Sequence, residues 1–156
     1  MNTVRRAKQT DIPAIMLLLE QVNGVHHNGR SDLFKERSTK YTKEELADII
    51  KNDKTPVFVC VDDDDNVLGH GFCVFEHSAG NNLVEHDTLY IDDICVNEDA
   101  RRQGVGKSLY LHIKDFAKES GCYNLTLNVW SCNPNAMRFY EKMGLYPYKV
   151  GMEEVL

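Results

Sequence analysis

Two spacings of apolar residues alternate along the chain and predict a sheet flanked by helices. Period-two or continuous apolar runs at 3–7, 57–61, 67–75, 88–96, 125–130 and 146–155 are typical of strands. Apolar residues three and four apart over 12–22, 42–50, 105–117 and 133–143 are typical of helices. The predicted order is β-α-α-β-β-β-α-β-α-β, an α/β class with a mixed sheet, in one domain over residues 1–156.

Capping and turn residues locate several ends of these predicted helices and strands. Thr42 followed by Glu45 forms a capping box, and Asn133 followed by Pro134 is a helix N-terminus. Asn23-Gly24 is expected to end the first helix, and residues 25–40 to form an irregular segment. Asp62-Asp-Asp-Asp-Asn66 is expected to be the turn of a hairpin, because the glycine and glutamate of a calcium loop are missing.

The composition indicates the general class of protein but not the reaction that it catalyses. Apolar residues make up 42% of the chain and charged residues 27%, as in an ordinary soluble domain. No apolar run approaches the ~20 residues of a membrane span, and the first residues lack the apolar region of a signal peptide. The 5 cysteines have no metal-binding spacing and indicate reduced thiols in a cytoplasmic protein. A net charge of −6 disfavours nucleic-acid binding and suits a cationic small substrate.

A glycine turn between a predicted strand and a predicted helix is the first candidate site. It reads Arg101-Arg-Gln-Gly-Val-Gly-Lys-Ser108. Backbone N–H groups at a helix N-terminus favour phosphate. A P-loop is excluded because Arg101 stands where its first glycine belongs, and a dinucleotide fingerprint because Leu109 replaces its third. An ordinary turn that caps a surface helix is the alternative.

A second motif makes a family resemblance specific. The segment Asn133-Pro-Asn-Ala-Met-Arg-Phe-Tyr140-Glu-Lys-Met-Gly144-Leu resembles N-x-x-A-x-x-F-Y-x-x-x-G-F of the GCN5-related N-acetyltransferases, with Leu145 in place of the usual aromatic residue. The R-x-x-G-x-G turn resembles the acyl-CoA loop of the same family, and the two stand in the family's order. The resemblance covers essentially the whole chain and implies the family's acyl-CoA fold.

The resemblance also implies which residues bind acetyl-CoA. The loop would hold the pyrophosphate through Arg101, Arg102, Gln103, Gly104, Val105, Gly106 and Lys107. Ile94, Cys95 and Val96 of the preceding strand would pair with pantetheine, and Asn133 and Ala136 would contact the same arm. Tyr140 lies seven positions after Asn133, on the same helical face, and would protonate the departing thiolate. A cysteine nucleophile at Cys95 is the competing idea, disfavoured because a thiol in an apolar strand is usually inert.

The acceptor side is predicted with less detail. The string Tyr90-Ile-Asp-Asp-Ile-Cys-Val96 is similar to the corresponding strand of polyamine acetyltransferases, which implies that Asp92 binds the amine or takes its proton, with a structural carboxylate as the alternative. Asp92 and Asp93 are expected on opposite faces of the strand. His26, His27 and Asn128 are further substrate-binding candidates. No metal is expected, since adjacent histidines do not face each other on a helix.

These inferences predict an acetyl-CoA-dependent enzyme that acetylates a primary amine by direct transfer. The expected acceptor is a small molecule: a polyamine, an aminoglycoside-like compound or an amino acid derivative. A protein N-terminus or lysine is the alternative, and a catalytically silent CoA sensor is a third possibility. The expected partners are acetyl-CoA and the amine, without nucleic acid or membrane, and a homodimer is a family expectation.

Overall fold

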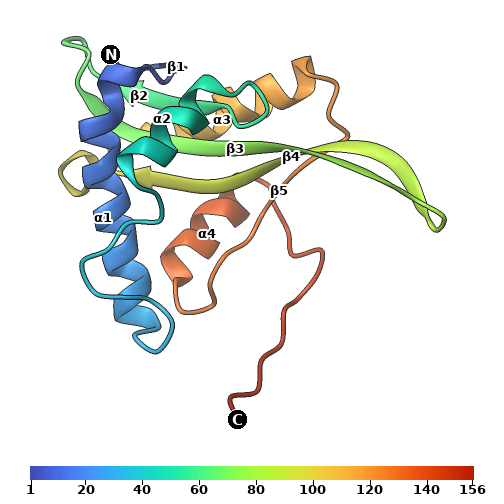
Figure 1. The fold of residues 1–156 in the computed structure, drawn as a ribbon. Helices are drawn as coiled ribbons and strands as arrows, with labels where there is room; N and C mark the ends of the chain where they lie inside the picture. The colour runs from blue at the N-terminus through green and yellow to red at the C-terminus, as the bar shows by residue number, and fades with distance from the viewer.

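A five-stranded sheet of order β1-β2-β3-β4-β5 runs through the computed structural model, which describes residues 1–156 (Figure 1). Neighbouring strands are antiparallel, except that β4 and β5 are parallel. The strands are β1 (Thr3–Arg6), β2 (Val57–Val61), β3 (Val67–Gly80), β4 (Leu83–Val96) and β5 (Asn124–Leu127). The predicted mixed α/β fold is therefore confirmed.

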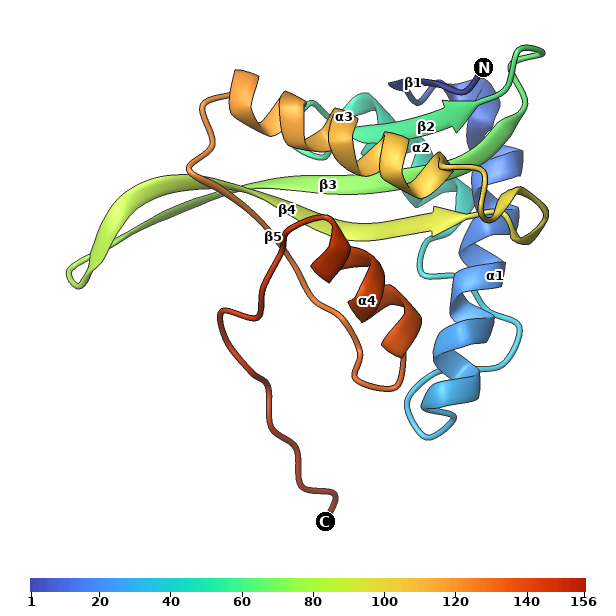
Figure 2. The same ribbon diagram turned by 180° about the vertical axis from the view of Figure 1, so that it is seen from behind.

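Helices cover both faces of this sheet, as the two opposite views in Figures 1 and 2 show. α1 (Ile12–Gly29) and α2 (Lys43–Lys51) pack on one face, and α3 (Val105–Glu119) and α4 (Pro134–Lys142) lie on the other. Two single-turn 3₁₀ helices, Gln9–Asp11 and Glu98–Ala100, precede α1 and α3. Because both faces are covered, every residue of β2 is buried, which explains its uninterrupted apolar sequence.

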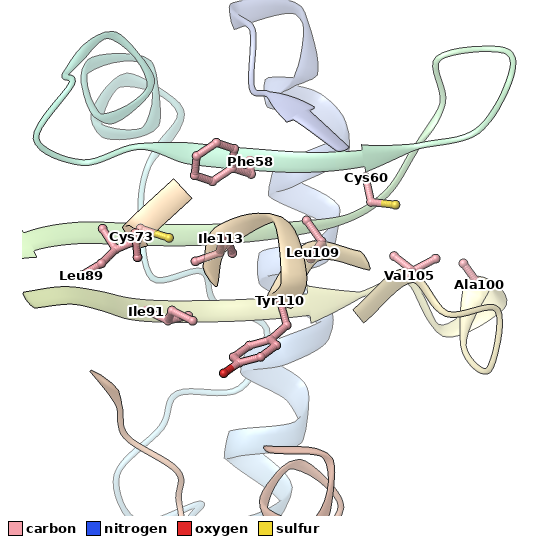
Figure 3. Close-up of a cluster of buried hydrophobic side chains, with 11 residues drawn as sticks. Phe58, Cys60, Cys73, Leu89, Ile91, Ala100, Val105, Leu109, Tyr110 and Ile113 are labelled. Atoms are coloured by element: carbon pink, nitrogen blue, oxygen red, sulfur yellow. The ribbon is translucent and has the colours of Figure 1, made fainter. Parts of the chain in front are cut away.

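Each face has its own hydrophobic core. The core under α3 joins sheet residues such as Phe58, Cys73 and Leu89 to Leu109 and Ile113 of the helix (Figure 3). The core under α1 and α2 is built from alternate residues of the same strands, among them Val57, Val59 and Phe72. The period-two pattern of a strand thus sends successive side chains to different cores.

The predicted capping residues occupy their expected places. The Thr42 hydroxyl accepts a hydrogen bond from the Glu45 N–H at 3.1 Å, and the Glu45 carboxylate accepts one from the Thr42 N–H at 2.9 Å. The Asn133 side chain accepts from the Ala136 N–H at 3.3 Å, with Pro134 in the first turn of α4. Local sequence therefore defines where α2 and α4 begin.

Three predicted boundaries are wrong. α1 continues through Gly24 to Gly29, because a glycine costs a helix only about 1 kcal/mol and tertiary packing outweighs that penalty. β3 and β4 extend beyond their predicted ranges of 67–75 and 88–96 and form one long hairpin that turns at 81–82. β5 ends at Leu127 rather than Trp130, because its parallel pairing with β4 stops at Ile91.

The predicted terminal strand at 146–155 is absent. This segment is extended but leaves the sheet and pairs with no strand (Figures 1 and 2). Its alternating apolar residues have the right period, but a strand also needs a neighbour to accept and donate its backbone hydrogen bonds. Glu153 instead accepts hydrogen bonds from Arg30, at the end of α1, at 2.9 and 3.2 Å.

None of the four α-helices combines the length and the apolar character that crossing a membrane requires.

Candidate active site

The glycine turn forms the N-terminus of α3, as predicted. Gly104 is the N-cap residue and has a φ of 77°, a left-handed conformation that glycine adopts without strain. Arg101, Arg102, Gln103 and Lys107 are exposed around it. The first turn of a helix presents N–H groups without intrahelical partners, and three cationic side chains add positive potential. The turn therefore fits a phosphate-bearing ligand.

Gly106 lies where this turn meets both α4 and the end of β4. A Cβ built on Gly106 would lie 3.4 Å from the Phe139 ring and 3.5 Å from Cγ2 of Val96. A hollow beside it is lined by Ile94, Cys95, Val96, Arg101 and Asn133, together with Val22 and Val25 of α1. Five residues predicted to bind acetyl-CoA thus line one hollow. The Asn133 side chain is also the N-cap of α4, so it positions that helix at the hollow.

The outer edge of β4 is open next to this hollow. β5 pairs with β4 only from Thr88 to Ile91, and no strand follows along residues 92–96. Backbone groups on that edge are therefore available to an extended ligand, which is how an added strand is bound by a sheet edge.

A β-bulge in β4 overturns the expected orientation of the two aspartates. The register with β3 shifts between Phe72 and Cys73, so Asp92 is the extra residue of β4. Asp93 then contacts His70, which packs edge-to-face on Phe72, and Asp92 contacts Tyr41, which stacks on the same Phe72 ring. Both carboxylates consequently point to the face covered by α1 and the segment 30–42.

Asp92 is already fully engaged in this structure. Nζ of Lys40 donates to both of its carboxylate oxygens at 2.7 Å, and the Tyr41 hydroxyl donates to Oδ2 at 2.7 Å. Burial and the negative charge of Asp92 raise the pKa of Tyr41, which keeps this hydroxyl a donor. The Asp92 site binds an alkylammonium group, and here that group is Lys40.

Tyr140 lies in the second half of α4, half-buried beside Phe139. Burial raises the pKa of its phenol well above the usual value, and the negative charge of Asp93 raises it further. The phenol is therefore protonated at neutral pH and can act as a proton donor. A tyrosine with a perturbed pKa, on the helix whose N-cap Asn133 lines the hollow, is a candidate general acid.

The three remaining substrate-binding candidates have different surroundings. His26 packs on the Phe34 ring, and burial lowers its pKa, an effect that the charge of Asp93 only partly offsets. His27 serves the fold, because its Nδ1 donates to the Phe34 carbonyl at 2.7 Å and fixes the segment after α1. Asn128 is exposed and donates to the Tyr90 hydroxyl at 3.2 Å.

Burial raises the pKa of the Cys95 thiol to about 12, and its Sγ donates to the Leu18 carbonyl. Such a thiol is not a nucleophile at neutral pH. No group of three or more His, Cys, Asp or Glu side chains is arranged to hold a metal ion.

Sequence reasoning missed the cluster that surrounds the aspartates. His70 is fully buried against Asp93, and the Phe34 ring contacts His26 and Trp130. His70 interrupts an otherwise apolar strand pattern, which was a usable signal for a buried polar pair. Its partner could not be found, because the bulge that brings Asp93 to it is not visible in the pattern.

A helix N-terminus suited to phosphate, an open strand edge and a protonated tyrosine are features that an acyltransferase using a CoA thioester requires. The acetyltransferase (GNAT) family model matches residues 24–145, so the chain belongs to that family. It is therefore an acetyl-CoA-dependent N-acetyltransferase by family, as predicted.

Relatives of known activity act on different amines. The chain is 28% identical over 153 residues to a thialysine N-epsilon-acetyltransferase of Bos taurus, covering 90% of this chain and 82% of that one. It is 37% identical over 87 residues to streptothricin acetyltransferase of Streptomyces lavendulae, covering 56% of this chain and 42% of that one. A solved structure of a tetramutant of the BH1408 protein from Bacillus halodurans superposes with a TM-score of 0.94 at 25% identity, over 99% of both chains.

Proposed function

We propose that the protein transfers the acetyl group of acetyl-CoA to a small cationic amine. The acidic cluster carries this proposal: two carboxylates, Asp92 and Asp93, lie on one face beside Tyr41, and one of them already holds an alkylammonium. A positively charged amine is the ligand that such a site favours. The relatives that acetylate thialysine and streptothricin support the same class of acceptor.

The α3 turn would bind the pyrophosphate of acetyl-CoA, and the open edge of β4 would pair with its pantetheine arm. This arrangement directs the thioester toward the hollow at Ile94, Cys95 and Val96, where strand amides can stabilise the oxyanion. The amine attacks directly, since the Cys95 thiol is unsuited to form an acyl-enzyme. Tyr140 then donates its proton to the departing thiolate.

A protein lysine is the second candidate acceptor. The chain is 26% identical over 144 residues to the peptidyl-lysine N-acetyltransferase YjaB of Salmonella typhimurium, covering 92% of this chain and 83% of that one. A lysine side chain and a small diamine present the same primary ammonium, so the site chemistry accommodates both.

The experiment is a CoA-thiol release assay with acetyl-CoA and a panel of amines. The panel contains diamines and polyamines, basic amino acids, an aminoglycoside and a lysine-containing peptide. The proposal predicts turnover with at least one small cationic amine and at least tenfold lower kcat/KM for the peptide. Turnover with the peptide alone would support the second candidate. Acetyl-CoA binding without any turnover would identify a sensor instead.

We propose in addition that the protein is a homodimer of a reducing compartment such as the cytoplasm. The segment 146–155 exposes Tyr146, Tyr148, Val150 and Met152 at alternate positions, with 58–90% of each residue accessible. Apolar residues repeated with strand period and left in solvent indicate a surface that another chain covers. All 5 cysteines are free, which suits a reducing environment.

A further inference from the structure

His70 is a polar side chain buried in the otherwise apolar stretch 67–75 of β3. It is 0% exposed and packs edge-to-face on Phe72, with ring centroids 4.8 Å apart. Its Nδ1 has no hydrogen-bond partner, and burying an unpaired polar atom is destabilising. An apolar side chain would avoid that cost, so the retained imidazole points to a role for its other nitrogen.

That other nitrogen, Nε2, lies 2.8 Å from Oδ2 of Asp93. A neutral ring with its hydrogen on Nε2 leaves no buried N–H unpaired, because Nδ1 then carries only a lone pair. In this tautomer His70 donates to Asp93 and fixes the orientation of the carboxylate. It engages one oxygen, and Oδ1 stays free of this bond.

Both oxygens of Asp92 are occupied by Lys40 and Tyr41, whereas Asp93 is hydrogen-bonded through Oδ2 to His70. The titratable groups around Asp93 come from every element packed there: His26 of α1, Tyr41 of the following segment, His70 of β3, Cys95 of β4 and Tyr140 of α4. The side chain of Asp93 is 15% exposed, so solvent or a ligand reaches it. Of the two carboxylates, Asp93 is the one with an oxygen that no protein group engages, and its negative charge acts on the Tyr140 phenol.

We propose that Asp93, positioned by the buried imidazole of His70, is the carboxylate that binds the acceptor ammonium and takes its proton. This assignment rests on the proposed function and replaces Asp92 in the role that the sequence predicts for it. Asp92, with Lys40 and Tyr41, instead forms the wall of the acceptor site.

The protons balance as follows in this scheme. Asp93 accepts one proton from the ammonium, and the free amine forms the new N–C bond while the C–S bond breaks, its electron pair going to sulfur. Tyr140 supplies the proton of the CoA thiol and is reprotonated by the second proton that the amine nitrogen loses. The proton on Asp93 leaves to solvent, so one proton is released for each amide formed.

The test compares Asp93→Asn with the matched variant Asp92→Asn, using acetyl-CoA and the panel amine with the highest turnover. Asp93→Asn is expected to lower kcat/KM roughly a hundredfold at pH 7. Its activity should recover as the pH rises toward the amine's own pKa, because free amine then forms without a base. Asp92→Asn is expected to lose less than about fivefold, mainly through KM. A larger loss in Asp92→Asn, or no alkaline recovery in Asp93→Asn, would overturn the proposal.

Variants of His70 test its positioning role. His70→Gln retains a side-chain N–H donor and should keep more kcat than His70→Leu, which removes it. Equal kcat in the two variants, both folded by circular dichroism, would refute the role. Nitrogen NMR of the wild type supplies a readout that needs no turnover: a proton on Nε2 whose resonance shifts in Asp93→Asn is expected. A proton on Nδ1 alone would refute the pairing even where no amine is acetylated.

Discussion

The individual residues of the candidate site were easier to predict from the sequence than the residues that they contact. The spacing from Asn133 to Tyr140 on α4 is local, and the helix keeps it. The roles of Asp92 and Asp93 depend on a bulge in β4 and on a segment some 50 positions earlier, namely Lys40 and Tyr41. Long-range contacts of this kind leave no trace in a periodic pattern.

Replacing Tyr140 by phenylalanine isolates its role as a proton donor. Tyr140→Phe keeps the half-buried ring against Phe139 and removes only the hydroxyl. Turnover should fall roughly tenfold or more, because the thiolate then leaves without a proton donor. The Kd for acetyl-CoA, measured by calorimetry, should change less than about twofold. Unchanged turnover would exclude Tyr140 as the acid.

At the scale of elements, caps and turns were the most predictable features. The capping box of α2, the proline start of α4 and the glycine turn before α3 are all written in short local motifs. The end of α1 and the lengths of β3 and β5 were not, because packing and strand pairing decide them. The open edge of β4, to which we propose that acetyl-CoA binds, is a consequence of where β5 stops.

A methyl group at Gly106 tests whether the turn binds acetyl-CoA. In Gly106→Ala the new Cβ makes ordinary contacts with Phe139 and Val96, and alanine favours a helix. The apo protein should therefore melt at the same temperature or slightly above. In the wild type, acetyl-CoA at about 100 times its Kd should add about 2.7 kcal/mol of stability. Most of that gain should vanish in the variant, since Cβ fills the approach to the cleft.

Gly80→Ala is the matched control, because Gly80 lies at the tip of the β3–β4 hairpin and its Cβ would meet no atom closer than 3.9 Å. The control should keep the full acetyl-CoA response in the same thermal-shift experiment. An undiminished response in Gly106→Ala would remove the turn from the cofactor site.

At the scale of the whole molecule, the sheet separates two cores and the cleft lies where their helices meet at the end of β4. The continuous apolar run at 57–61 was correctly predicted to be a strand, and both faces of β2 are buried. The same reasoning failed for the segment 146–155, whose period is that of a strand although no neighbouring strand pairs with it. The spacing of apolar residues therefore indicates which secondary structure a segment can adopt. Whether it adopts that structure depends on its contacts with the rest of the molecule.

Light scattering on the intact chain tests whether a second copy covers this segment. The wild type should have the mass of two chains. The double variant Val150→Glu, Met152→Glu should shift toward one chain, because charges replace two of the exposed apolar residues. Lys149→Glu with Glu154→Lys alters charged neighbours only and should stay dimeric. A monomeric wild type would contradict the proposed dimer.

The most direct measurement is mass spectrometry of the acceptor after incubation with enzyme and acetyl-CoA. A small cationic amine should gain the mass of one acetyl group on nitrogen, in a one-to-one ratio with free CoA thiol, and the protein itself should carry no acetyl intermediate. Acetyl-CoA that binds but leaves every cationic amine unmodified would contradict the account.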